Sequence, residues 1–154
     1  MTRIETSIEL DVPIATAFDA ERNISLHAST QKDRGERAVS GVTHGLIELG
    51  EEVEWEAIHF GVRQRLRVRI THMDKPKYFR DEMVFGAFKS FAHEHHFREA
   101  GLGKTLKTDI LTLSAPFGVF GQITEKLFLA VYMRRFLEKK NLELKKLIEE
   151  KTEV

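Results

Sequence analysis

The clearest pattern along the chain is an alternation of apolar and polar residues in short segments. It occurs in residues 3–10, 36–41, 53–60, 62–73, 77–85, 87–98 and 104–114. A period of two places successive side chains on opposite faces of a β-strand. Glycine or a Lys-Pro-Lys turn separates most of the later segments, so the spacing predicts a first strand followed by an antiparallel meander of hairpins.

Two short helices after the first strand and one long helix after the last strand are also predicted. Residues 13–21 follow the first strand, and Pro13 suits the first turn of a short helix. A second short helix is predicted around Ser25 to Gln31. From residue 122 to residue 150 there is no proline or glycine, and apolar residues recur three and four positions apart, which predicts one long C-terminal helix.

The C-terminal helix is expected to contact the sheet unevenly. Residues 127–133 are apolar on nearly every side, whereas Leu137, Leu144 and Ile148 form a narrower stripe among lysine and glutamate. The sheet should therefore wrap around the first half of this helix and only lean against the second half. Between the last strand and this helix, residues 114–121 (SAPFGVFG) fit neither pattern.

The segment AFKSFAHEHHFRE, residues 87–99, holds three of the seven histidines of the chain. Its alternation predicts a strand whose buried face carries Phe91, His93, His95 and Phe97. Glu94, His96 and Arg98 should then face solvent. His93 and His95 would lie about 7 Å apart on one face and could share a ligand.

The composition narrows the functional classes. A chain of 154 residues is expected to form one domain, residues 1–154. Lysine plus arginine equals aspartate plus glutamate at 24 each, so there is no net basic field and we expect no nucleic-acid partner. The absence of cysteine excludes disulfides and thiolate chemistry. Without a signal peptide or an apolar run of membrane length, a cytoplasmic protein with no stable membrane insertion is expected.

A row of arginines allows two interpretations. Arg63, Arg65, Arg67 and Arg69 share one face of a strand and could bind phosphates. The preceding strand carries glutamates that a tight hairpin at Gly61 would place opposite these arginines. A cross-strand ladder of charges on the solvent face is therefore favoured over an anion site.

The order of elements resembles that of the START-like helix-grip superfamily, also called SRPBCC, which includes polyketide cyclases or dehydrases and lipid-transport proteins. The resemblance covers nearly the whole chain and is strongest to a bacterial branch of small stand-alone members. The segments that carry it are DVPIATAF, WEAIHFGVRQRLRVRI, FRDEM followed by GAFKSFAHEHHF, GKTLKTD and SAPFGVFG. These segments mark architecture, and none of them is a catalytic signature.

The resemblance implies an α+β fold in which a curved antiparallel sheet grips the C-terminal helix around a cavity for an apolar small molecule. Eleven phenylalanines against two tyrosines suit such an interior. The candidate ligand-binding residues are Trp55, His59, Phe79, Asp81, Met83, Phe91, His93, His95, Phe97, Leu111, Leu127, Val131 and Tyr132. No cofactor is expected.

Two aspartates are expected to accompany the histidines inside the cavity. Asp81 shares the inward side if a bulge at Gly86 keeps the register even, and the hairpin at residues 99–103 can place Asp109 across from His93. These groups could satisfy one another, orient a ligand in an apolar pocket, or bind a metal ion. No metal is expected, because the strand guarantees only two imidazoles. His27, His44 and His72 lie near turns or short helices and are expected to be solvated.

The function favoured by the sequence is binding of an apolar or amphipathic small molecule, which could be a lipid, a polyketide or an isoprenoid-like compound. The first alternative is an enzyme of cyclase or dehydratase type whose catalytic candidates are His93, His95 and Asp109, with His93 as general base. The second is a carrier or regulator that acts through a protein or membrane partner. Neither the ligand nor the oligomeric state follows from the sequence, since members of one fold differ in function.

Overall fold

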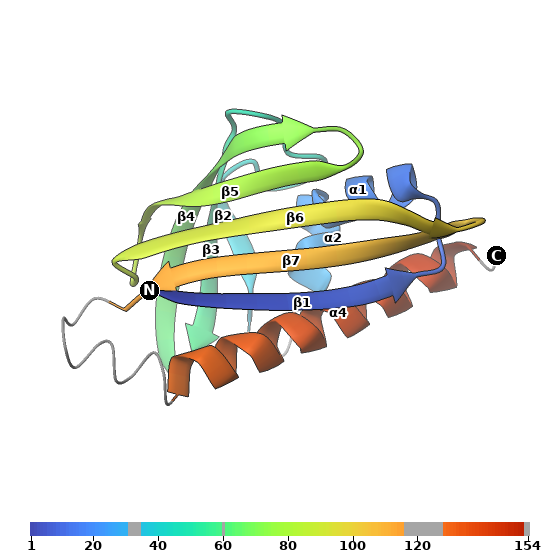
Figure 1. Cartoon of the computed structure of the whole chain (residues 1–154). Coiled ribbons are helices and arrows are strands. Elements are labelled where there is room, and N and C mark those ends of the chain that lie inside the picture. The colour runs from blue at the N-terminus through green and yellow to red at the C-terminus, as the bar shows by residue number, and fades with distance from the viewer. Residues whose placement is uncertain (31–34, 60, 116–127, 153–154) are drawn as a thin grey trace.

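A computed structural model describes residues 1–30, 35–59, 61–115 and 128–152 of the chain. It contains a seven-stranded antiparallel sheet in the order β1-β7-β6-β5-β4-β3-β2 (Figure 1). The strands are β1 (Thr2–Leu10), β2 (Arg37–Gly41), β3 (Glu52–His59), β4 (Val62–Asp74), β5 (Tyr78–Gly86), β6 (Ser90–Gly101) and β7 (Lys104–Ser114). The predicted meander is thus confirmed, with β1 added beside β7.

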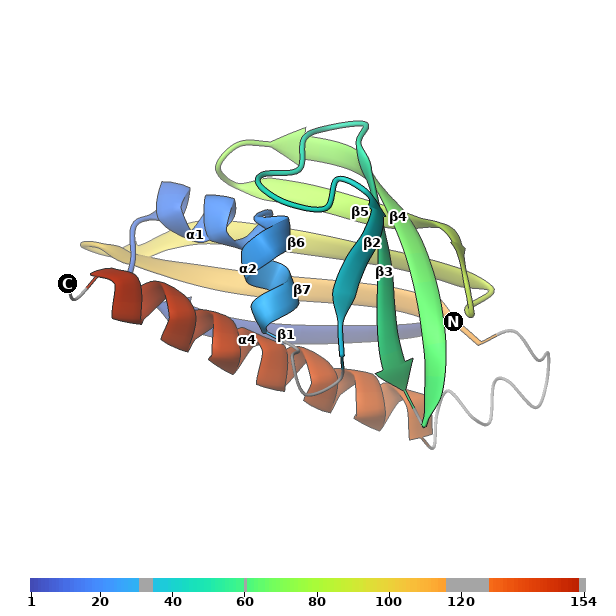
Figure 2. The same cartoon turned by 180° about the vertical axis from the view of Figure 1, so that it is seen from behind.

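Three helices of the described part of the chain lie on the inner side of the curved sheet (Figures 1 and 2). They are α1 (Ile14–Glu21), α2 (Ile24–Ser29) and α4 (Ala130–Thr152). Pro13 precedes α1, and the side chain of Asn23 accepts a hydrogen bond from the backbone of Leu26 at the start of α2. The predicted residues 122–127 of the last helix and most of the SAPFGVFG segment lie outside the described residues.

The core divides into two clusters that leave space between them. In the first, Phe18 of α1 packs edge-on against Phe79 and Phe97, with ring centroids 5.5 Å apart in both pairs. In the second, Leu111 and Leu113 of β7 pack against Met133 and Leu137 of α4, with Ile4 beside them. The α1 helix and the first half of α4 are therefore anchored to different parts of the sheet.

The predicted contrast between the two halves of α4 is wrong. Phe128 just before the helix and Val131 in its first half are 66% and 48% exposed, while Leu144 and Ile148 in the second half are 3% and 4% exposed. The reason is that the sheet contacts α4 from one side only. Even an apolar helical segment then keeps one face in solvent, and the second half is buried as deeply as the first.

The arginine row forms the predicted ladder on the outer face of the sheet. The register pairs Glu54 with Arg67 and Glu56 with Arg65. The carboxylate of Glu56 accepts hydrogen bonds from Arg37 at 2.9 Å, Arg63 at 2.7 Å and Arg65 at 3.1 Å. The bonds from Arg37, which has the larger effect, and from Arg63 lower the pKa of Glu56 to about 2. The arginines are therefore engaged with carboxylates, as the ladder interpretation predicts.

Among the helices that the structure describes, none combines the length and the apolar character that crossing a membrane requires.

Candidate functional site

A cavity of about 430 Å³ lies between the inner face of the sheet and the helices. Its volume is within the usual range for small-molecule sites. Nine of the residues predicted to bind a ligand line it, namely Trp55, His59, Phe79, Asp81, Phe91, His93, His95, Leu111 and Tyr132. The alternation pattern and the resemblance together therefore identified much of the cavity wall.

Three predicted wall residues do not line the cavity. Phe97 packs instead against the ring of Phe18, because α1 covers that part of the sheet. Met83 lies beside a bulge in β5, which falls at Val84 and not at Gly86 as predicted, and the strand bends there. Val131 points to solvent from the far side of α4. Leu127 lies outside the described residues.

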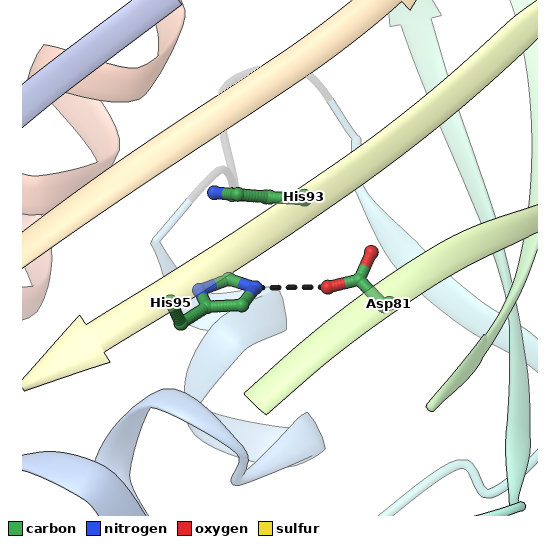
Figure 3. A group of neighbouring side chains, drawn as sticks. All are labelled: Asp81, His93 and His95. Carbon is green, nitrogen blue, oxygen red and sulfur yellow. Dashed lines mark hydrogen bonds and ion pairs between the residues drawn. The ribbon is translucent and has the colours of Figure 1, made fainter. Parts of the chain in front are cut away.

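The two central histidines face inward as predicted. His93 is 6% exposed and His95 is 2% exposed, whereas the side chain of His96 is 43% exposed. The ring centroids of His93 and His95 are 3.9 Å apart, and the two rings lie side by side in Figure 3. The strand face that carries them is thus buried, with Glu94 and His96 only partly buried and Arg98 exposed on the other side.

The register around these histidines differs from the predicted one. Across the strands, His93 pairs with Leu111 and Asp81, while Asp109 pairs with His95. The side chains nevertheless bond diagonally. His93 Nε2 donates to Asp109 Oδ1 at 2.9 Å, and His95 Nε2 donates to Asp81 Oδ2 at 2.8 Å (Figure 3 shows the second bond). The predicted contact between His93 and Asp109 therefore forms across a register that is shifted by two residues.

A layer of buried polar groups beneath the histidines was not predicted. The ammonium of Lys107 donates to Asp109 Oδ2 and, at 2.7 Å, to Asn141 Oδ1. Asn141 Nδ2 also donates to Asp109 Oδ2 at 2.9 Å. Glu21, at the end of α1, places Oε2 3.4 Å from Lys107 Nζ. This layer joins α1, β7 and α4 through buried ion pairs and hydrogen bonds.

The sequence contained signals for part of this layer. Lys107 lies two residues from Thr105 and two from Asp109 in β7. The period of two therefore places all three side chains on the same, inner face. Asn141 follows Leu137 by four positions and precedes Leu144 by three, so it falls on the apolar stripe of α4. No comparable signal identifies Glu21, because its burial depends on how α1 docks on the sheet.

The charges around His95 keep its ring protonated. Its Nδ1 lies 3.2 Å from Glu21 Oε1 and 3.3 Å from Asp109 Oδ1, near enough for ion pairs although neither contact has the alignment of a hydrogen bond. Burial alone would lower the pKa of His95. Its contacts with Asp109, Asp81 and Glu21 outweigh burial and raise that pKa to about 10. At neutral pH His95 is therefore an imidazolium.

His93 has the opposite protonation state. Burial, and then the positive charge of His95, lower the pKa of His93 more than the carboxylate of Asp109 raises it. Burial would raise the pKa of Asp109, but the ammonium of Lys107 and the two histidines hold it well below its usual range. Neutral His93 therefore carries its proton on Nε2 toward an ionised Asp109, which leaves Nδ1 as an acceptor.

Among the residues that the structure describes, two sets of three have the spacing of a metal site. They are Asp81, His93 and His95, and Glu21, His95 and Asp109, and within each set the ligand atoms lie within 4.8 Å of one another. Both sets include His95. A metal ion would have to displace a proton from an imidazolium with a pKa of about 10. The absence of a metal therefore stays a prediction, and the charge of His95 supports it.

His27 is not solvated, which contradicts the prediction for it. Its side chain is 15% exposed and lines the cavity, and its ring stacks on Trp55 with centroids 4.9 Å apart. The reason is that α2 lies over the inner face of the sheet. A short helix that looks like a surface element in sequence thus contributes to the wall.

The cavity has an apolar end and a polar end. Leu129 just before α4, and Met133 and Phe136 within it, line the cavity ahead of Lys140. Along β6, Phe91 precedes His95. Both elements run in the same general direction, away from the end of the molecule where β1 begins (Figure 1). At the apolar end, His59 Nδ1 and Tyr132 Oη share a hydrogen bond of 2.6 Å, which links β3 to α4.

Comparison with known proteins finds the same fold at low sequence identity. No protein-family model and no curated protein matches the chain. A protein of Thermus thermophilus superposes with a TM-score of 0.78 at 16% identity, covering 96% of this chain and 97% of that one. A START superfamily protein from Mycobacterium smegmatis has a TM-score of 0.74 at 12% identity, with 96% and 97% covered. Major latex-like protein 151 from Panax ginseng has a TM-score of 0.65 at 13% identity, with 94% and 95% covered. The chain therefore has the START-like helix-grip fold.

Proposed function

We propose that the chain binds one amphipathic small molecule, of lipid, polyketide or isoprenoid type, in the cavity between the sheet and α4. The observation that carries this proposal is the cavity of about 430 Å³, with apolar walls at one end and buried polar groups at the other. The apolar part of the ligand lies against Phe91, Met133 and Phe136. Its polar part lies toward Asp81 and His93.

Two acceptor atoms support this orientation. His93 bonds to protein only through Nε2 and Asp81 only through Oδ2, among the residues that the structure describes. His93 Nδ1 and Asp81 Oδ1 therefore remain for a hydrogen-bond donor on the ligand. A ligand hydroxyl or amide at this end can therefore donate a hydrogen bond to either atom and gain affinity.

Native mass spectrometry of the purified protein tests the proposal. The wild type should carry one bound organic molecule per chain. The substitution Ala57→Phe places a ring into the cavity from the inner face of β3, so it should reduce the bound fraction. Ile58→Phe is the matched control, because Ile58 is 42% exposed on the opposite face. Equal occupancy in both variants would contradict binding in this cavity.

An enzymatic function is the second candidate, and the bond between His93 and Asp109 favours it. A neutral imidazole that is oriented by a carboxylate can act as a general base through its free nitrogen. His93 Nδ1 would remove a proton from a carbon next to a carbonyl group and later return one. In heavy water, a long-chain methyl ketone should then exchange these protons for deuterium, as seen by NMR, and His93→Gln should abolish the exchange. Exchange at the buffer rate with the wild type would rule this function out.

A further inference from the structure

A second polar group lines the cavity, and neither the ligand nor the reaction discussed above uses it. It consists of His27 on α2, Glu36 just before β2, Trp55 on β3 and Lys140 on α4. Lys140 is only 8% exposed although its side chain is charged. These residues come from four separate elements, so the fold itself brings them together.

Lys140 differs from the other cations of the cavity wall. Arg22, Arg65 and His95 each lie within 4 Å of at least one carboxylate. Lys140 Nζ donates to His27 Nε2, and over the described ranges no carboxylate oxygen lies within 4 Å of it. Within those ranges its charge is therefore buried without a carboxylate in ion-pair contact, an arrangement that costs free energy unless a ligand supplies one.

The hydrogen-bond partner of Lys140 does not neutralise its charge. Burial, and then the charge of Lys140, lower the pKa of His27 to about 3, so His27 is neutral and acts as an acceptor. Glu36 Oε1 lies 3.8 Å from His27 Nε2. Burial raises the pKa of Glu36, although the charge of Lys140 acts on that pKa in the opposite direction. The ammonium thus has hydrogen-bonding capacity left over, since it carries three donors.

We infer that the polar part of the ligand also carries an anionic group that Lys140 binds, and that this group is a carboxylate. A single ammonium with no arginine fork matches a monoanion better than a phosphate dianion. From Lys140, the helix α4 leads back to its first residue, Ala130, over about 15 Å at 1.5 Å per residue, so an extended apolar tail can follow the cavity toward its apolar end. The inference rests on the proposed function and narrows it to apolar carboxylic acids.

Trp55 provides the readout for the test. It is the only tryptophan of the chain, and it stacks on His27 beside Lys140. Its fluorescence should change when a probe reaches this end of the cavity. Titrations at neutral pH compare decanoate, decanol and decylamine, which share one tail and differ in head group. Wild-type protein should bind decanoate about tenfold more tightly than decanol, since bonds to charged groups are the stronger ones, and decylamine least tightly.

Two variants test whether Lys140 causes the preference for decanoate over decanol. Lys140→Met removes the charge at similar length, so decanoate should lose about tenfold in affinity and decanol should change by less than about threefold. Lys146→Met, on an exposed position of the same helix, should leave both affinities unchanged. Circular dichroism checks that each variant is folded, and Lys140→Gln replaces Lys140→Met if that variant is not.

The outcomes separate this inference from the proposed function. If decanol binds but decanoate binds no more tightly, or if Lys140→Met keeps the preference for decanoate, the carboxylate inference is overturned and ligand binding stands. If none of the three probes binds to the wild type, both are overturned. The order of the three probes on the wild type decides the question even without a variant.

Discussion

The protonation state of each histidine in the centre of the cavity wall depends on the number of carboxylates that it contacts. His93 and His95 are two positions apart on one strand, yet one is neutral and the other is a cation. His93 contacts one carboxylate and His95 contacts three. Sequence could not distinguish them, because both occupy equivalent positions in the alternation.

The charge of His95 gives stability a defined pH dependence. Its pKa rises from 6.5 to about 10 on folding, so its contribution is complete below about pH 6.5 and is lost as pH rises toward 10. The free energy of unfolding of the wild type should therefore fall over this range in urea titrations. His95→Gln leaves buried carboxylates without their partner and should cost about 3–5 kcal/mol at pH 7. The deficit should shrink toward pH 10.

The control for this prediction is His96→Gln. His96 is 43% exposed in its side chain, so the variant should stay within about 0.5 kcal/mol of the wild type and keep its pH profile. Parallel wild-type and His95→Gln profiles between pH 7 and 10 would contradict the assigned charge.

The protonated ring of His95 also predicts the metal content. Plasma mass spectrometry of gently purified protein should find far less than one zinc or iron per chain, because both possible ligand sets need an unprotonated His95. One metal ion per chain, lost when His93 and His95 are both changed to alanine, would show that the prediction is wrong.

At the scale of elements, alternation identified which faces are buried but not how neighbouring strands align. A shift of two residues leaves every side chain on its face, so the pattern in β6 and β7 is compatible with more than one register. The turn at Gly101 and the irregularity after Glu99 decide between these registers. Consequently the inward residues His93 and Asp109 were predicted correctly, while their pairing across the strands was not.

The helix α4 shows the same limit and allows a direct test. Its period identifies a stripe, but not how far the sheet extends around it. Leu144→Ala should destabilise the protein by about 2–5 kcal/mol, because Leu144 is 3% exposed within the main core. Leu142→Ala, at a position 58% exposed two residues away, should change stability by less than about 0.5 kcal/mol. Urea denaturation measures both, and similar losses would contradict the one-sided packing of α4.

For the whole molecule, the order of elements was enough to predict the fold, although the three structures compared above are only 12–16% identical to this chain. Alternation, hairpin spacing and the final helix survive when residue identities change, because the core requires inward apolar positions more than particular residues. The space between the two core clusters could not be predicted in the same way. Its volume depends on how α1, α2 and α4 dock, which local patterns do not determine.

That space makes the stability of the whole molecule depend on ligand. If the proposed function is right, decanol at about one hundred times its dissociation constant should add about 2.7 kcal/mol to the free energy of unfolding. For a chain of this length the melting temperature should then rise by about 5–10 °C. Ala57→Phe should abolish this rise without lowering the melting temperature of the free protein, since the ring enters space that is already present. Ile58→Phe should keep the full rise. An unchanged rise in Ala57→Phe would place the bound alcohol outside the cavity.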